Sequence, residues 1–219
     1  MSAADPEVQA AVDGCRRAHE RLLAAVEGLD DAGVRAPSLL PDWSRAHVLT
    51  HLARNADSHT RMLGAALAGE AVEQYAGGAQ ERAAAIAAGA DRPADAVRAD
   101  VARSVAGLEA AWAAMTPAAW DGHGLARGTP WPCRSMPAMR RREVEIHLVD
   151  LGTGLIPGAW PEDYVQAELP RALAGLPERL DPDGRRALLA WLVGRRPDPG
   201  PLPLRRWEER PGGYLRGVT

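Results

Sequence analysis

The feature that most constrains the fold is a series of long segments in which apolar residues recur every three or four positions. This spacing is typical of amphipathic helices. It predicts helices over residues 6–28, 45–67, 91–115 and 135–151, with a weaker Ala-rich helix at 79–88. Four long helices are most simply arranged as an antiparallel four-helix bundle. The sequence therefore predicts a mainly α fold.

Residues before and between these segments indicate where the helices begin. Asp5 precedes a proline, a common start for a helix because the Asp side chain can cap the first turn. Ser44 is placed in the same way before the second helix, with Trp43 and Val48 positioned to form a hydrophobic staple around it. Residues 121–134 contain Gly, Pro and His without periodicity, which predicts a loop there.

The composition of the chain changes after Pro157, where proline becomes frequent. The remaining segment is small for an independent hydrophobic core, so we expect it to pack on the bundle. We predict a helical bundle domain over 1–156 and a small α or α+β domain over 157–219. The elements predicted in the second domain are helices at 163–176 and 184–193 and a short strand near Leu202–Trp207.

The composition bounds the class of protein. With 46% hydrophobic and 25% charged residues among 219, the chain is typical of a soluble globular protein that can bury a sizeable core. A metal site would therefore serve chemistry rather than folding. A net charge of −3 argues against nucleic acid as a partner. With no long apolar run and an acidic beginning, we expect a cytoplasmic protein without a membrane partner, as a monomer or small homo-oligomer.

The two cysteines, Cys15 and Cys133, lie far apart in the sequence and in no metal-like spacing. In a cytosolic protein we expect both to be free thiols that serve packing.

Two predicted helices each carry a pair of possible metal ligands four residues apart, His47 with His51 and Glu143 with His147. Side chains at this spacing share one helical face. Imidazole and carboxylate groups together are a favourable ligand set for zinc and an acceptable one for nickel, cobalt or iron. Two ligands from one helix and one from another leave positions open for water or substrate, which is typical of a catalytic metal site. A solvated helix face is the alternative interpretation of each pair.

The spacing alone does not choose the third ligand among six histidines. His51 lies deeper in its helix than His47, which is in the first turn. His59 can share the face of His51, but two turns away. His19 and His123 have no partner at ligand spacing, so we expect both on the surface or in a loop.

The segments Leu39–Ala56 and Met139–Gly152 carry a resemblance to a known family. The first, with Pro-Asp-Trp-Ser followed by two histidines, resembles the N-terminal motif of the mycothiol-dependent maleylpyruvate isomerases, within the DinB-like metalloprotein superfamily. The second is similar to that family's R-E-x-x-x-H-x-x-D-L-G signature. The resemblance covers residues 5–155 and implies a DinB-like four-helix bundle. The zinc ligands that it implies are His51, Glu143 and His147, with water in the open position.

The resemblance also implies a cofactor and a reaction. The cofactor is mycothiol, in keeping with a chain that lacks Lys and Phe and is rich in Ala, Arg and Gly, a composition that hints at a GC-rich actinobacterium. A zinc-activated thiolate would add to the cis double bond of maleylpyruvate and leave after rotation, giving fumarylpyruvate.

Three further residues are given roles, one from the resemblance and two from their positions near the ligands. The resemblance assigns Arg195, in a Gly-Arg step, to the carboxylates of the substrate. Asn55, one turn beyond His51, is assigned to binding the cofactor or orienting a ligand. Asp150 is placed to accept the second N–H of His147 or to favour the helix end. Two other functions share parts of this prediction: a zinc-dependent mycothiol S-transferase, and a non-catalytic DinB-like binding protein.

Overall fold

The computed structural model describes residues 5–198 and 200–202. Its contacts divide the chain into two compact units, Met1–Trp160 and Pro161–Thr219. The fold is mainly α, as predicted. None of the helices in the described ranges is long and apolar enough to cross a membrane. The division into domains at residue 156 stays a prediction.

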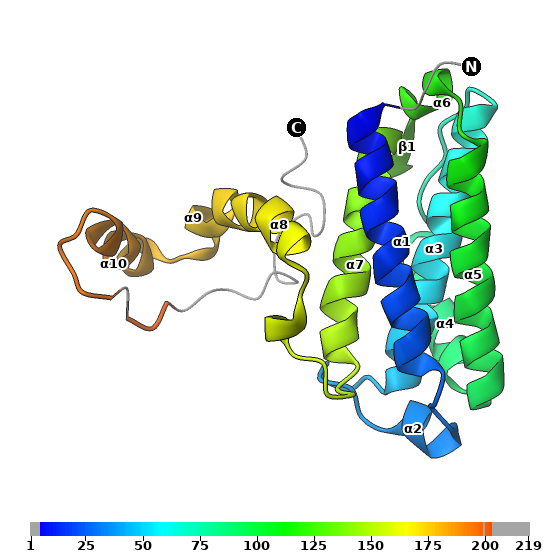
Figure 1. Cartoon of the computed structure of the whole chain (residues 1–219), viewed down its shortest axis with the longest axis horizontal. Helices are drawn as coiled ribbons and strands as arrows, with labels where there is room; N and C mark the ends of the chain where they lie inside the picture. Colours follow the sequence, from blue (N-terminus) through cyan, green and yellow to red (C-terminus); the bar gives the residue numbers. More distant parts are fainter. Residues whose placement is uncertain (1–4, 199, 203–219) are drawn as a thin grey trace. The chain divides into compact units, whose positions relative to one another are not determined.

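The first unit is built on four long helices: α1 (Pro6–Val26), α3 (Arg45–Leu67), α5 (Ala94–Ala114) and α7 (Met136–Asp150). Helices α3 and α1 each pack against both α5 and α7, so the four helices close into a bundle (Figure 1). The predicted four-helix bundle is confirmed, and each long helix lies within three residues of its predicted bounds.

The predicted caps explain where two of these helices begin. The Asp5 side chain accepts a hydrogen bond from the backbone N–H of Glu7 at 2.9 Å, at the start of α1. At the start of α3, the Ser44 hydroxyl accepts from the backbone N–H of His47 at 3.4 Å. The His47 ring in turn accepts from the backbone N–H of Ser44 at 3.3 Å. This reciprocal arrangement is a capping box in which histidine takes the place usually held by glutamate.

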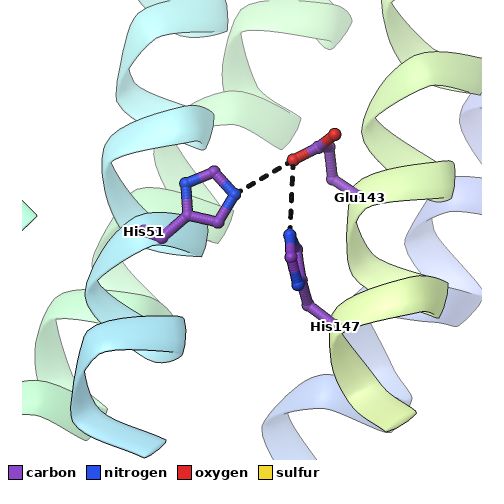
Figure 2. A group of neighbouring side chains, drawn as sticks. All are labelled: His51, Glu143 and His147. Atoms are coloured by element: carbon purple, nitrogen blue, oxygen red, sulfur yellow. Dashed lines mark hydrogen bonds and ion pairs between the residues drawn. The ribbon is translucent and has the colours of Figure 1, made fainter. Parts of the chain in front are cut away.

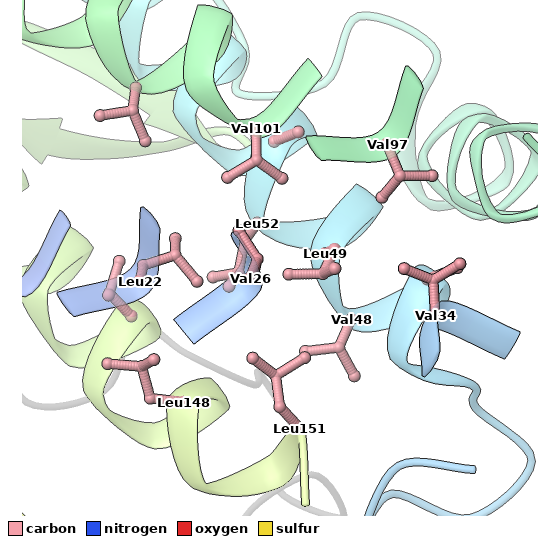
Figure 3. Packing of buried hydrophobic residues seen from close by; sticks show 14 of the residues in the cluster. Leu22, Val26, Val34, Val48, Leu49, Leu52, Val97, Val101, Leu148 and Leu151 are labelled. Carbon is pink, nitrogen blue, oxygen red and sulfur yellow. The ribbon is translucent and has the colours of Figure 1, made fainter. Parts of the chain in front are cut away.

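Apolar side chains from the four bundle helices meet in one continuous core (Figure 3). The short helix α2 (Asp31–Arg35) contributes Val34 to the same cluster. Burying each aliphatic side chain of this size contributes about 1.5–3 kcal/mol, so this core favours the association of the helices that carry the candidate ligands. Fully buried members of the cluster include Leu22, Val34, Val48, Leu49, Leu52, Val97, Val101 and Leu151.

The segment 121–134 corrects one prediction, because much of it forms an antiparallel hairpin of β1 (His123–Ala126) and β2 (Thr129–Pro132). Its turn places Arg127 and Gly128 at φ values of 53° and 76°, which is what a two-residue hairpin turn of this twist requires. Strands of four residues are too short to show an alternating pattern.

Four shorter elements complete the first unit. They are α4 (Gly78–Ala90), which packs on α3, α6 (Pro117–Trp120) and two 3₁₀ turns. The turns are η1 (Cys133–Ser135) and η2 (Pro157–Ala159).

The second unit contains α8 (Glu162–Ala174), α9 (Leu176–Arg179) and α10 (Pro182–Leu192). The two helices predicted for this region are therefore present. Asp181 caps α10 by accepting from the backbone N–H of Gly184 at 2.7 Å. The strand predicted near Leu202–Trp207 lies outside the described residues apart from Leu202.

Candidate metal centre

Three of the predicted ligands meet between α3 and α7. His51 comes from α3, while Glu143 and His147 lie one turn apart on α7 and point toward it (Figure 2). The Glu143 Oε2 atom is 3.1 Å from His51 Nε2 and 3.8 Å from His147 Nε2. All three side chains are buried, and one ligand atom from each lies within 4.8 Å of the others. The structure thus brings together the three residues singled out from the sequence.

The spacing of these atoms fits a small divalent cation. Zinc bonds to imidazole nitrogen and carboxylate oxygen are about 2.0–2.1 Å long, so ligand atoms at tetrahedral angles lie about 3.3 Å apart. The distances of 3.1 and 3.8 Å in the cluster bracket this value. Three protein ligands also leave one tetrahedral position open, as in catalytic zinc sites.

The orientation of His147 is fixed by Asp150. The Nδ1 atom of His147 lies 2.8 Å from the Asp150 carboxylate, one turn further along α7. Because an ionised carboxylate only accepts hydrogen bonds, Nδ1 carries the proton and Nε2 presents its lone pair to Glu143 and His51. This carboxylate–histidine arrangement is common around zinc, and the geometry agrees with the predicted role of Asp150.

His51 has two neighbours that the sequence did not reveal as a group. Arg82, on α4, places its Nη2 atom 2.9 Å from His51 Nδ1. The Trp43 ring packs edge-on against the imidazole, with 5.9 Å between ring centroids. Since guanidinium can only donate, His51 Nδ1 accepts here and the ring proton lies on Nε2, facing Glu143.

Burial and charge set the protonation of the cluster. Burial lowers the pKa of His51 to about 4, although the hydrogen bond with Glu143 opposes this. Burial alone would raise the pKa of Glu143, but the hydrogen bond from His51 and the charges of His51, His147 and Arg140 outweigh it and lower the pKa to about 2. At neutral pH the cluster therefore combines a carboxylate with a neutral imidazole at His51, the forms that bind metal.

A buried arginine joins the two ligand helices beside the cluster. Arg140 lies on α7 one turn before Glu143 and is fully buried. Its Nη1 atom donates to the Leu52 carbonyl and to Asn55 Oδ1 on α3, both at 2.9 Å. Arg140 therefore fixes the position of the Asn55 side chain. If Asn55 orients a ligand, as predicted, it would do so through this contact with Arg140. Its predicted part in cofactor binding stays a prediction.

The remaining histidines fall outside the triad. His47 is used in the cap of α3, and His123 is exposed on β1. His59 is buried two turns beyond His51, and neither of its ring nitrogens has a hydrogen-bond partner among the described residues. The expectation that His19 lies on the surface is wrong. It is buried, and both of its ring nitrogens have partners there. Nδ1 pairs with Glu109 at 2.8 Å, and Nε2 accepts a hydrogen bond from Arg140 at 3.2 Å.

The two cysteines are free and buried, as expected. Burial raises the pKa of Cys15 to about 12 and that of Cys133 to about 11. Both thiols therefore stay protonated and unreactive at neutral pH. Arg195 follows α10 in the second unit, and its assignment to the substrate stays a prediction.

The buried His59 should make the stability of the protein depend on pH. Burial lowers its pKa from 6.5 to about 3, so as the pH falls below 6.5 only the unfolded chain takes up a proton there. Between about pH 7.5 and pH 5 this should cost the folded state about 2 kcal/mol. In the His59→Leu variant, this part of the pH-dependent loss of stability should be absent.

Urea unfolding at several pH values would measure this effect. As a control for loss of an imidazole, His123→Leu should keep the wild-type dependence. An unchanged dependence in His59→Leu would mean that the buried ring is not kept neutral.

A mainly α bundle with a buried His-Glu-His cluster between two of its helices defines the class of protein as a helical bundle with a candidate metal centre. Residues 15–152 match the family model described as the mycothiol maleylpyruvate isomerase N-terminal domain. The chain belongs to this family, as its sequence motifs predicted.

Solved structures agree with this assignment. The chain is similar to the crystal structure of the mycothiol-dependent maleylpyruvate isomerase, with 31% identity and a TM-score of 0.69. The likeness covers 73% of this chain and 66% of that one, slightly under two thirds of its length. A histidine-to-alanine mutant of that isomerase matches with 30% identity, the same TM-score and the same coverage. A search of curated proteins found no match.

Proposed function

We propose that this protein is a mycothiol-dependent maleylpyruvate isomerase that holds a divalent metal, zinc by its donor set, at His51, Glu143 and His147. The observation that carries the proposal is the convergence of these three buried side chains, with ligand atoms within 4.8 Å, in a chain of this family. The metal when bound would lower the pKa of a thiol and hold it as thiolate. Mycothiol would supply that thiol, whose reversible addition lets the substrate rotate about its former double bond.

The chain's own residues prepare this chemistry. Glu143 is ionised and His51 neutral before any metal binds, so neither has to lose a proton to solvent at neutral pH. Asp150 holds His147 with Nε2 toward the centre. Trp43 covers one edge of His51, which limits the access of water to the ligand.

The burial of the protein's own cysteines supports the proposal that the reacting thiol comes from a cofactor. Cys15 and Cys133 are buried, and their pKa values are raised to about 12 and 11. Neither can supply a thiolate at neutral pH. A reaction that proceeds through a thiolate therefore needs the sulfur of a cofactor, in line with the mycothiol dependence of the similar isomerase.

The decisive test is to supply maleylpyruvate and mycothiol to the zinc-loaded protein and to follow fumarylpyruvate by chromatography. We expect the product to accumulate with mycothiol recovered unchanged, and no product when the thiol is omitted. Consumption of mycothiol in proportion to substrate would instead identify an S-transferase. Absence of both reactions would favour a non-catalytic binding protein.

A further inference from the structure

One cation beside the triad has no part in the function proposed so far. Arg82 lies on α4 and is partly exposed. Its guanidinium carbon lies over the ring of Tyr75, 5.9 Å from the centroid, and its Nη2 atom reaches His51 Nδ1 at 2.9 Å. Of its five N–H donors, one contacts His51 and another hydrogen-bonds the Tyr75 side chain. The rest of the guanidinium fork can bind another acceptor.

The contact between Arg82 and His51 is incompatible with a metal at His51 Nε2. A neutral imidazole has one proton, and a metal on Nε2 leaves that proton on Nδ1. Nδ1 then donates, as does every nitrogen of the guanidinium, so the two groups no longer form a hydrogen bond. A metal bound at His51 Nε2 would therefore release Arg82 from this contact.

The way α4 is attached lets Arg82 move without leaving the centre. The C-terminal end of α4 packs closely on α3, where a Cβ atom at Gly89 would come within 2.2 Å of the Thr50 side chain. Buried residues of α4 lie only toward that end, beginning with Ile86. The first half of the helix, which carries Arg82, is exposed and therefore less constrained.

We propose that Arg82, released from His51 when the metal binds, becomes the residue that binds a carboxylate of the substrate. Arginine pairs with carboxylate through two parallel hydrogen bonds. The nature of the substrate, a small dicarboxylate, rests on the proposed function. Arg140 is fully buried and bonded to Asn55 and to the Leu52 carbonyl, so it cannot take this role without breaking the bundle.

The first test measures zinc affinity by competition with a chelator, without any substrate. Arg82→Ala should bind zinc about three- to tenfold more tightly than wild type, because the variant has no hydrogen bond to lose and one fewer positive charge near the site. The matched control is Arg103→Ala, which removes an exposed arginine paired with Asp100 and should leave zinc affinity unchanged. Equal or weaker zinc binding by Arg82→Ala would overturn the release of Arg82 by metal.

The second test measures carboxylate binding to the zinc-loaded protein by calorimetry, with maleate as the probe and no thiol present. Arg82→Ala should weaken maleate binding at least about tenfold, Arg82→Lys should recover part of it, and Arg103→Ala should match wild type. Equal binding by Arg82→Ala, or no binding by wild type, would overturn the carboxylate role. Maleate binding that depends on Arg82 in a protein without isomerase activity would instead contradict only the proposed reaction.

Discussion

The wild-type protein is expected to hold close to one zinc ion per chain, and replacing His51 with alanine is expected to remove it. Two ligands from a single helix, Glu143 and His147, would remain, and the third side of the site would be open to water. Without the metal, thiol activation is lost, so isomerase activity should fall about a thousandfold or more, equivalent to about 4 kcal/mol of transition-state stabilisation. Metal analysis of the purified variant and the fumarylpyruvate assay measure the two effects.

The chain provides a matched control for this substitution. His47 lies one turn earlier on the same helix, and its ring bonds the backbone of Ser44 in the cap. His47→Ala should cost about 1 kcal/mol of stability, the usual effect of losing a capping interaction, and keep both zinc and activity. Full zinc content in His51→Ala, or its loss in His47→Ala, would contradict the proposed ligand set.

The sequence predicted the bundle because the signals for it are local. Each long helix shows its apolar stripe within its own residues, and Asp5 and Ser44 are adjacent to the helices that they cap. The hairpin was missed because its turn depends on Arg127 adopting a positive φ, a conformation that non-glycine residues rarely take. Its prolines at positions 130 and 132 also argue against a strand.

The candidate site was predictable to the extent that it is local or carried by a family motif. Glu143 and His147 follow from helical spacing, and Asp150 from its position three residues after His147. The pairing of His51 with them is a tertiary contact that came from the resemblance. Arg82 is 31 residues from His51, on a helix with few buried residues, and no spacing rule connects the two.

The burial of His19 was also not predictable, because it depends on contacts with residues that are distant in the sequence. Its sequence surroundings contain no ligand partner, and a lone histidine on a helix is usually exposed. Burial becomes tolerable because Glu109, 90 residues away, accepts from Nδ1, while Arg140 donates to Nε2. Both ring nitrogens are thereby satisfied, which offsets the cost of removing them from water.

Replacing Arg140 with methionine should weaken both the fold and the metal site. Methionine keeps the apolar volume of the side chain but removes the donors to His19, the Leu52 carbonyl and Asn55. Buried acceptors left without donors cost about 1–3 kcal/mol each. Because removing a buried charge returns part of this, we expect the free energy of unfolding to fall by about 2–4 kcal/mol. Urea unfolding of the metal-free protein measures this change.

The same variant should also bind zinc about tenfold more weakly, since the loss of contacts that orient ligands typically has an effect of this size. Arg140 ties α7, one turn before Glu143, to α3 at a point one turn after His51. Without this link the two ligand helices can shift relative to each other. Chelator competition would detect the change, and an unchanged zinc affinity would mean that packing alone fixes the helix register.

A double-mutant cycle with Asn55→Leu separates this link from general destabilisation. If Asn55 acts through Arg140, the double variant should be destabilised less than the sum of the single variants by at least about 1 kcal/mol, because each single change strands a buried polar group that the double change removes. Additive effects on the free energy of unfolding would contradict the coupling. Such a result would instead favour a direct contact between Asn55 and the cofactor, the other role that its position beside His51 allows.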